Sequence, residues 1–343
     1  MDVLWMIVLT VGLLGSHCEG AISCKNENGD NVDWFILYKK SAGFDYVYTD
    51  STDKNLKKNN KPVNHQAGVL AHTLNPYFEK NKQSPHFGFI AYNDQTPSCN
   101  ALKEYGHSKG VVMMDKDNVV WLLHSTPKFP AGDESNNFYP ESGKTYAQIF
   151  MCVTLKSAQS AQIEHNPEKL KDSSTAPQPL PYHEILKSAG GQQFKRFVKQ
   201  VSKEKDPKEG DLYVTIANTL QSNLYIQTWR SEPTDPKKRP LSETEKKKLV
   251  TITSVKTAAG EWKHGCDHSK WCVSDSKDWM CVGDSNREPS QFERPGGALC
   301  INNPSVAEAF RQIINSSVPV ADSVSATDCV PGPPKKPKLD STG

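Results

Sequence analysis

The sequence of 343 residues lacks the features that mark several common protein classes. After the first twenty residues it has no apolar run near the roughly 20 residues that a membrane-spanning helix needs. It has neither a Cys-x-x-Cys nor a His-Glu-x-x-His spacing, so a zinc ribbon and a zinc hydrolase are not expected. It also has no amphipathic apolar helix suited to a lipid surface. We therefore expect a soluble protein with no cofactor, no metal and no membrane partner.

The chain also lacks a strong excess of charge of either sign. Lys and Arg number 41 against 39 Asp and Glu, a formal net charge of +2. Its 10 His titrate near neutrality, so the net charge rises in acid. A polyanion would then be attracted more strongly than at neutral pH. Composition alone does not separate this interpretation from simple solubility.

Residue patterns divide the chain into five parts. The start contains a short apolar run, Trp5 to Leu14, followed by small residues, which is typical of a signal peptide although no Lys or Arg precedes the run. The polar stretch ending SSTAPQPLP indicates an exposed linker. The predicted parts are a signal peptide (1–20), an N-terminal half (21–156), a linker (157–182), a C-terminal half (183–330) and a flexible basic tail (331–343). The tail contains PKKPK, which resembles a nuclear-localisation cluster but is more simply a flexible end.

One tripeptide occurs twice, about half the chain apart. His107-Ser108-Lys109 and His268-Ser269-Lys270 each precede an apolar stretch, a polar turn and a second apolar stretch. A further polar residue closes each block, His124 in the first and Asn286 in the second. A single His-x-Lys would be unremarkable, because chance produces it often. Two copies with similar downstream patterns predict two similar halves that share one site.

The residue types in these blocks suit phosphoryl chemistry. An imidazole can act as nucleophile or general acid near neutral pH. A Lys two positions along a strand lies on the same face as the His. Two ammonium groups can neutralise charge on phosphoryl oxygens without a metal. We expect His107, Lys109, His268 and Lys270 to surround one phosphate. His124 could belong with them, or could simply end a strand and hydrogen-bond a loop.

Apolar periodicity predicts a mixed α/β (α+β) fold. Strands are expected over 32–39, 43–50, 87–92, 111–114, 119–123, 148–155, 223–229 and 249–255. Helices are expected over 194–201, 241–248 and 304–315.

The motifs together resemble the deoxyribonuclease II (acid DNase) family and, more distantly, the phospholipase D superfamily. The resemblance covers nearly all of the chain after residue 20. It is carried by VDWFILYK, GHSKGVV, WLLHSTPKFP, DHSKWCVS and CVGDSNREPSQFERPGGALC. The second block also fits the superfamily pattern H-x-K-x4-D through Asp275. The first departs from it, with Met114 where the Asp would stand and Asp115 one residue later.

The resemblance implies a phospholipase D-like pseudodimer formed by one chain, with two similar sheet-and-helix halves. It implies an acid endonuclease that cleaves double-stranded DNA without divalent metal and leaves 3′-phosphate and 5′-hydroxyl ends, through a phosphohistidine intermediate. By position it makes His107, Lys109, His124, His268 and Lys270 the active-site residues, with Asn286 in support. His268 is slightly favoured as the nucleophile, because its block fits the wider pattern better. Lysosomal residence or secretion is implied as well.

Two other functions remain open on the sequence. One is a phospholipase D-like phosphodiesterase acting on phospholipid. The other is a secreted, non-catalytic or toxin-like DNA-binding relative.

Eight cysteines follow the predicted signal peptide, an even number that favours disulfides in an exported protein. The expected pairs are Cys24–Cys152, Cys281–Cys300 and Cys266–Cys329. Cys99 and Cys272 are left without an assignment. Asn315-Ser316-Ser317 is a candidate glycosylation site at Asn315.

Overall fold

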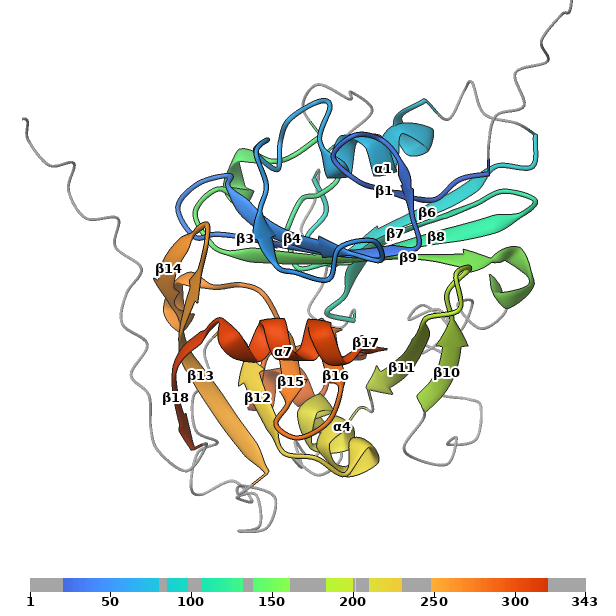
Figure 1. Cartoon of the computed structure of the whole chain (residues 1–343). Helices are drawn as coiled ribbons and strands as arrows, with labels where there is room; N and C mark the ends of the chain where they lie inside the picture. The colour runs from blue at the N-terminus through green and yellow to red at the C-terminus, as the bar shows by residue number, and fades with distance from the viewer. Residues whose placement is uncertain are drawn as a thin grey trace, which may run out of the picture.

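The protein is described by a computed structural model that covers residues 21–79, 85–97, 106–131, 138–160, 183–199, 201, 210–229 and 248–319. The predicted signal peptide, most of the predicted linker and the predicted tail lie outside the described residues. So does most of the expected helix 241–248. These predictions stay predictions. The described part is a mixed α/β structure in which strands dominate and helices are few (Figure 1).

The N-terminal half forms a seven-stranded sheet with one helix on its outer face. In spatial order its strands are β5 (Lys57–Lys58), β4 (Tyr46–Asp50), β3 (Trp34–Lys39), β9 (Gln148–Lys156), β8 (Asn118–His124), β7 (Lys109–Met114) and β6 (Gly88–Asn93). Helix α1 (Val69–Phe78) packs with the short hairpin of β1 (Cys24–Lys25) and β2 (Asn31–Val32) against this outer face. Two 3₁₀ turns, Glu141–Gly143 and Ser157–Gln159, flank β9.

The C-terminal half forms a nine-stranded sheet. Its strands in spatial order are β10 (His183–Lys187), β11 (Gln193–Lys199), β17 (Gly296–Asn302), β16 (Trp279–Gly283), β15 (Trp271–Ser274), β12 (Leu224–Gln227), β13 (Leu249–Thr257) and β14 (Gly260–Lys263), with β18 (Ile314–Pro319) also pairing β13. The helices are α4 (Leu212–Leu220), the short α6 (Pro289–Phe292) and α7 (Pro304–Gln312), and a 3₁₀ turn spans His264–Cys266.

The two sheets share a five-strand arrangement. The order β3-β9-β8-β7-β6 in the first sheet matches β11-β17-β16-β15-β12 in the second, and every neighbouring pair in both is antiparallel. In each half a helix, α1 or α4, precedes the strand at the end of that series. The two halves therefore form a duplicated arrangement, in agreement with the repeated tripeptide.

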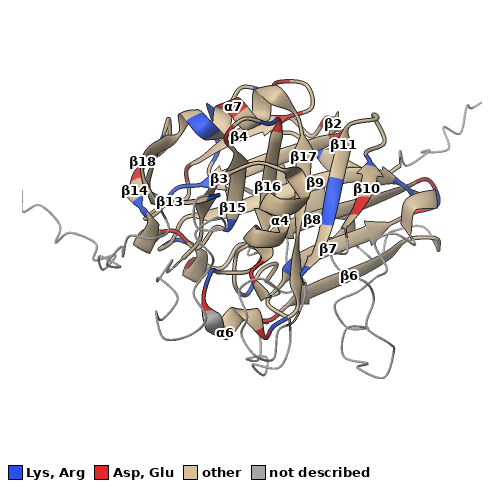
Figure 2. Cartoon of the chain, turned by 90° about the horizontal axis from the view of Figure 1, so that it is seen from below, with Lys and Arg blue, Asp and Glu red and all other residues tan. Residues whose placement is uncertain are grey.

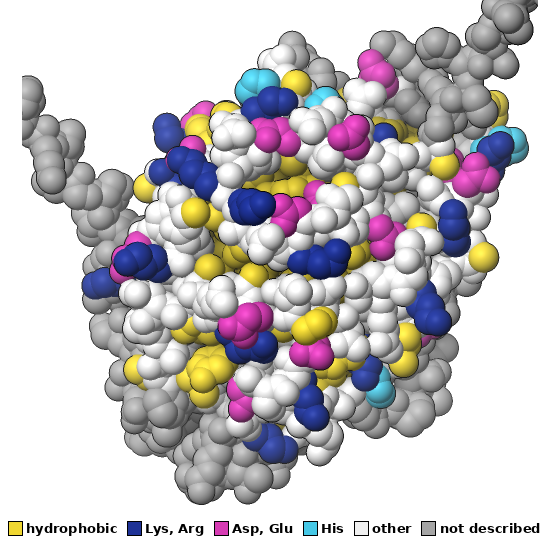
Figure 3. All heavy atoms as spheres, viewed as in Figure 1, with side chains coloured by type: hydrophobic (Ala, Val, Ile, Leu, Met, Phe, Trp, Pro, Cys, Tyr) yellow, Lys and Arg dark blue, Asp and Glu magenta, His cyan; other side chains and the backbone are white. Residues whose placement is uncertain are grey.

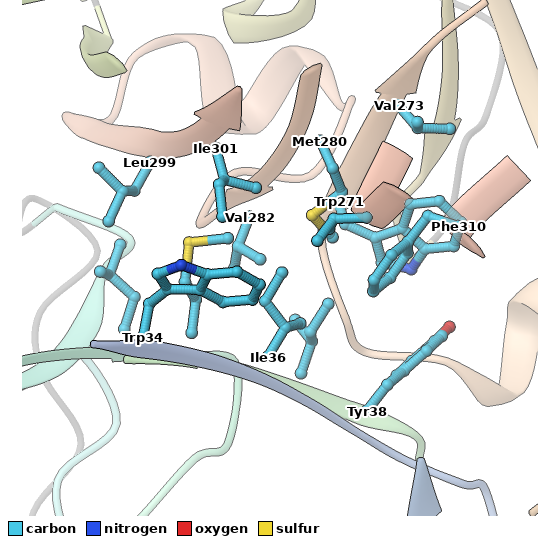
Figure 4. Close-up of a cluster of buried hydrophobic side chains, with 14 of the residues drawn as sticks. Trp34, Ile36, Tyr38, Trp271, Val273, Met280, Val282, Leu299, Ile301 and Phe310 are labelled. Carbon is cyan, nitrogen blue, oxygen red and sulfur yellow. The ribbon is translucent and has the colours of Figure 1, made fainter. Parts of the chain in front are cut away.

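One apolar core lies between the two sheets. Trp34, Ile36 and Tyr38 of β3 face Trp271 and Leu299 of the second sheet (Figure 4). Helix α7 adds side chains to the same core and lies between the sheets in Figure 1. Separate clusters cover the outer face of each sheet, under α1 and under α4. Because the central cluster draws on both halves, the sheets are held in a fixed relation to each other.

Two of the predicted disulfides are confirmed. Cys24 bonds to Cys152, and Cys281 bonds to Cys300. Cys266 is disulfide-bonded, but its predicted partner Cys329 lies outside the described residues, so that pair stays a prediction. The Cys272 thiol is free and buried. The unassigned Cys99 is also outside the described residues.

The expected helix over 194–201 is wrong, because residues 193–199 form strand β11. Phe194 packs in the core between the sheets, whereas Phe197 packs on the outer face under α4. A strand covered on both faces carries apolar residues without strict alternation. Their spacing therefore resembled that of a helix. The expected helix at 304 ends at Gln312, and β18 follows it.

Candidate active site

Both His-Ser-Lys tripeptides lie where a strand begins. Lys109 is the first residue of β7, and Lys270 immediately precedes β15. The two lysines come from different sheets, yet each is 5% exposed and their charges interact. Burial, followed by repulsion from Lys109, lowers the pKa of Lys270 to about 7. The structure therefore brings Lys109 and Lys270, one from each tripeptide, close enough for their charges to interact.

His107 is oriented by the C-terminal half. Its Nδ1 donates a hydrogen bond to the backbone carbonyl of Asp284, which fixes the proton on Nδ1 and leaves Nε2 as the basic nitrogen of the neutral ring. Its backbone N–H donates to Pro295 O at 2.9 Å. Burial, and then the cations of Lys109 and Lys270, hold the pKa of His107 well below its usual value. His107 is thus a neutral imidazole surrounded by positive charge.

Asp94 and Arg294 belong to the same cluster, and sequence reasoning missed both. The Asp94 carboxylate pairs with the Lys109 ammonium and lies 3.0 Å from the Arg294 guanidinium and 4.0 Å from His107 Nε2. Burial alone would raise the pKa of Asp94, but the cations of Lys109 and Arg294 hold it below its usual value. Asp94 follows β6 directly, so a polar residue just after a predicted strand was the available signal.

His268 packs against two aromatic side chains. Its ring stacks on Tyr146 with centroids 3.8 Å apart and an interplanar angle of 9°, and Trp229 lies at 4.3 Å. Its backbone N–H donates to Ala147 O at 3.0 Å, and its carbonyl accepts from Lys270 Nζ at 2.6 Å. The two motif histidines therefore have different environments.

His124 lies opposite Lys109, on the neighbouring strand β8. Continuing the β7–β8 register from Gly110–Leu123 places it opposite Lys109. The ring packs against Phe129 and Phe150, and neither of its nitrogens has a hydrogen-bond partner with good geometry. Burial, and then the Lys109 cation, lower the pKa of His124 to about 3 despite a small opposing effect of the Thr126 backbone. His124 is consequently neutral even in acid.

Asn286 does not occupy the position equivalent to His124. In the second half, Gly283 N donates to Lys270 O at 2.9 Å, so Gly283 is the residue opposite Lys270. Asn286 comes three residues later, is 6% exposed, and leaves its Oδ1 buried without a hydrogen-bond partner. Next to it, Arg287 pairs with Asp211 at 2.9 Å and so ties the segment to α4. The similar sequence spacing of His124 and Asn286 arises because the strands of the β7–β8 hairpin, 6 and 7 residues, are longer than the 4 and 5 residues of β15 and β16.

Asp275 and Asp115, the carboxylates compared with the superfamily pattern, lie at the far ends of β15 and β7. Asp275 accepts from Ser222 Oγ at 2.9 Å and Asn223 Nδ2 at 2.6 Å. Asp115 accepts from the backbone N–H groups of Asp117 and Asn118. Both carboxylates stabilise turns, so the structure gives them no place among the imidazoles and lysines.

Charged segments are interspersed around the described part of the molecule. Figure 2 shows Lys and Arg alternating with Asp and Glu along the chain, and Figure 3 shows the same mixture on the face seen in Figure 1. Within the described ranges, no three His, Cys, Asp or Glu side chains gather as metal ligands. In the same ranges, every helix is too short or too polar to cross a membrane. Asn315 is exposed, so its predicted glycosylation is compatible with its position.

Comparisons with known proteins agree with the duplicated site. The family model described as Deoxyribonuclease II matches residues 23–167 and again residues 166–320. Deoxyribonuclease-2-alpha of Rattus norvegicus is 32% identical over 354 residues, covering 91% of this chain and 98% of that protein. Deoxyribonuclease-2-beta of Rattus norvegicus is 30% identical over 348 residues, with 90% and 95% covered. Plancitoxin-1 of Acanthaster planci is 30% identical over 349 residues, with 89% and 94% covered. This chain belongs to the deoxyribonuclease II family.

Proposed function

We propose that the protein is an acid endonuclease that hydrolyses phosphodiester bonds of double-stranded DNA without a divalent metal. The observation that carries the proposal is the convergence of Lys109 and Lys270, one from each half, on the His107 ring. Two ammonium groups next to a neutral imidazole can bind a phosphodiester and stabilise the charge that develops on its non-bridging oxygens. Family membership supports DNA as the substrate, and a phospholipase D-like pseudodimer is the fold that we propose.

The different settings of the two histidines suggest a division of roles. His107 is neutral and anchored through Nδ1, so its Nε2 is suited to attack phosphorus. His268, whose ring stacks on Tyr146 beside Trp229 and comes from the other half, is then the group that protonates the departing 5′-oxygen. This reverses the slight preference for His268 as nucleophile that the motif comparison favours.

Two steps then complete the reaction. Attack by His107 Nε2 forms a P–N bond as the P–O5′ bond breaks, and His268 gives its proton to O5′. Water next attacks phosphorus, passes a proton to His268 and releases His107, which leaves a 3′-phosphate. Lys109 and Lys270 hold the non-bridging oxygens. Asn286 and His124 are supporting residues in this proposal, His124 from its position opposite Lys109.

Single substitutions of the two histidines test the proposal. We expect His107→Ala and His268→Ala each to reduce plasmid nicking near pH 5 in EDTA by about 10²–10⁴-fold, the usual worth of such groups. The products of the parent should carry 5′-hydroxyl ends that polynucleotide kinase labels without prior phosphatase. His65→Ala, at an exposed position outside the cluster, is the control and should retain activity.

Several results would contradict the proposal. Full activity in either variant would remove that histidine from the mechanism. Loss of the parent's activity in EDTA would indicate a metal-dependent nuclease. Hydrolysis of phosphatidylcholine instead of DNA, or DNA binding without cleavage, would favour the two alternative functions. Lysosomal residence or secretion is part of the same proposal, and the two disulfides are compatible with an oxidising compartment.

A further inference from the structure

Two buried lysines have no part in the proposed chemistry. Lys39 ends β3 and is 0% exposed, and Lys199 ends β11 and is 3% exposed. An ammonium group is rarely buried unless its N–H groups are satisfied. In both residues the donors reach backbone carbonyls of loops, so the contacts indicate what each lysine holds in place.

The hydrogen bonds of the two lysines end on comparable loops. Lys39 Nζ donates to the carbonyls of Lys40 at 2.6 Å, Gly43 at 2.9 Å and Lys144 at 3.2 Å. Lys199 Nζ donates to the carbonyls of Phe292 at 3.2 Å and Arg294 at 2.7 Å. Lys144 lies in the segment that leads into β9, and residues 292–294 lie in the segment that leads into β17.

Strand register shows that these are equivalent positions in the two halves. In the first half the register pairs Gly110 with Leu123, Leu123 with Met151, and Met151 with Ile36 of β3. In the second half it pairs Trp271 with Val282, Val282 with Leu299, and Leu299 with Arg196 of β11. Ile36 is therefore equivalent to Arg196, and Met151 to Leu299. By the same offsets Lys39 corresponds to Lys199, and the segment 144–147 corresponds to 292–295.

Each of these segments holds the motif histidine of the opposite half. Ala147 O accepts from His268 N at 3.0 Å, and Tyr146 stacks on the His268 ring. In the same way Pro295 O accepts from His107 N at 2.9 Å. Arg294 pairs with Asp94 beside the His107 ring. The support is crossed. The lysine of one half donates hydrogen bonds to a loop of its own half, and that loop accepts a hydrogen bond from the motif histidine of the other half.

We propose that Lys39 and Lys199 are positioning residues, Lys39 for His268 through segment 144–147 and Lys199 for His107 through segment 292–295. The kinetic part of this inference rests on the proposed function. Burial lowers the pKa of Lys39 to about 7 and that of Lys199 to about 8, so both remain charged donors in acid. Loss of either ammonium would free the loop carbonyls and shift one imidazole while leaving the other in place.

The experiment compares Lys39→Met and Lys199→Met on two substrates. One is plasmid DNA, whose 5′-alkoxide needs a proton to leave. The other is thymidine 3′-(4-nitrophenyl phosphate), whose nitrophenolate leaves without one. Lys61→Met is the matched control, because Lys61 Nζ also donates to two carbonyls, Glu27 O at 3.2 Å and Ala67 O at 2.8 Å, outside the cluster.

We expect a crossed pattern. Lys39→Met should lower kcat on DNA about 10- to 100-fold, the cost of a small misplacement, and spare the first-turnover burst of nitrophenolate, because on that substrate only the later attack of water uses His268. Lys199→Met should lower kcat on both substrates, because it displaces the nucleophile. KM should stay close to that of the parent in both variants, and Lys61→Met should retain kcat. Equal effects of the two variants on both substrates, or no effect on kcat, would overturn the proposal.

A second measurement does not depend on activity. In ¹⁵N NMR spectra of the imidazoles, Lys39→Met should shift the His268 signals and Lys199→Met those of His107. If the parent cleaves no DNA, the proposed function fails while these shifts still decide the positioning role. If a Met variant does not fold, the Gln variant, which keeps an N–H donor, should show the same crossed shifts. Shifts in the histidine of the same half would contradict the inference.

Discussion

At the scale of single residues, some groups of the candidate site could be recognised in the sequence, and others became apparent only in the structure. The repeated tripeptide is visible without any structure, and it drew attention to Lys109 and Lys270, whose charges interact in the fold. Asp94 and Arg294 could not, because their significance comes from a contact between residues 200 positions apart. His124 illustrates a further limit, since its spacing from His107 says nothing of the aromatic rings that keep it neutral.

Asp94 is the anion that offsets the charge of Lys109 and Arg294. We expect Asp94→Asn to reduce the free energy of unfolding by about 3 kcal/mol or more, because buried cations would lose their partner. Urea denaturation at pH 6 measures this. Glu308→Gln, which removes an exposed ion pair with Arg311, is the control and should leave stability close to that of the parent. A loss no larger than that of the control would show that Asp94 does not stabilise the cluster.

At the scale of elements, hairpins were predicted better than helices. The β7–β8 hairpin has two continuous apolar runs around a polar turn, and its predicted position is confirmed. Helices α1 and α4 were not predicted. Pro76 lies inside α1, and its N-terminus has no side-chain cap. For α4 a signal was available, because Asp211 caps its N-terminus by accepting from Tyr213 N.

The Cys281–Cys300 disulfide joins β16 to β17, the strands on either side of the Asp284–Asn286 segment. We expect the double variant Cys281→Ser/Cys300→Ser to lose about 3 kcal/mol of stability, the usual worth of a bridge closing a loop of this length. Urea denaturation of the oxidised protein measures the loss. Cys272→Ser, at the neighbouring free thiol, is the control for replacing a buried sulfur. A double variant as stable as this control would contradict the prediction.

At the scale of the whole molecule, the duplication was predictable but the crossing between halves was not. A repeat indicates two similar units, yet nothing in its spacing says that a loop of one unit holds the histidine of the other. On the face seen in Figure 3, Lys and Arg side chains of the described part lie among Asp and Glu side chains.

The stability of the whole molecule should depend on pH through Asp284. Burial raises the pKa of this carboxyl to about 7, although the Gly297 N–H and the Lys109 cation oppose the shift. The stabilisation from holding its proton is therefore fully present below about pH 4, the ordinary value for Asp, and is lost as the pH rises through about 7.

Asp284→Asn should remove this part of the pH dependence, because Asn keeps the acceptor for Gly297 N at 3.0 Å. Melting temperatures at pH 5 and pH 8 test the prediction, and the variant should lose less on going to pH 8 than the parent does. Equal losses would show that Asp284 does not carry the titration.

The shared core and the crossed loops have a consequence for how the chain could be divided. A cut between β9 and β10 would leave two fragments, each with an exposed apolar sheet face and half of the ionisable groups. Neither fragment alone could position its motif histidine, because the loop that hydrogen-bonds to that histidine belongs to the other fragment. Together the two fragments could restore both hydrogen bonds. The protein is therefore suited to fragment complementation, in which recovered turnover reports that the two pieces have met.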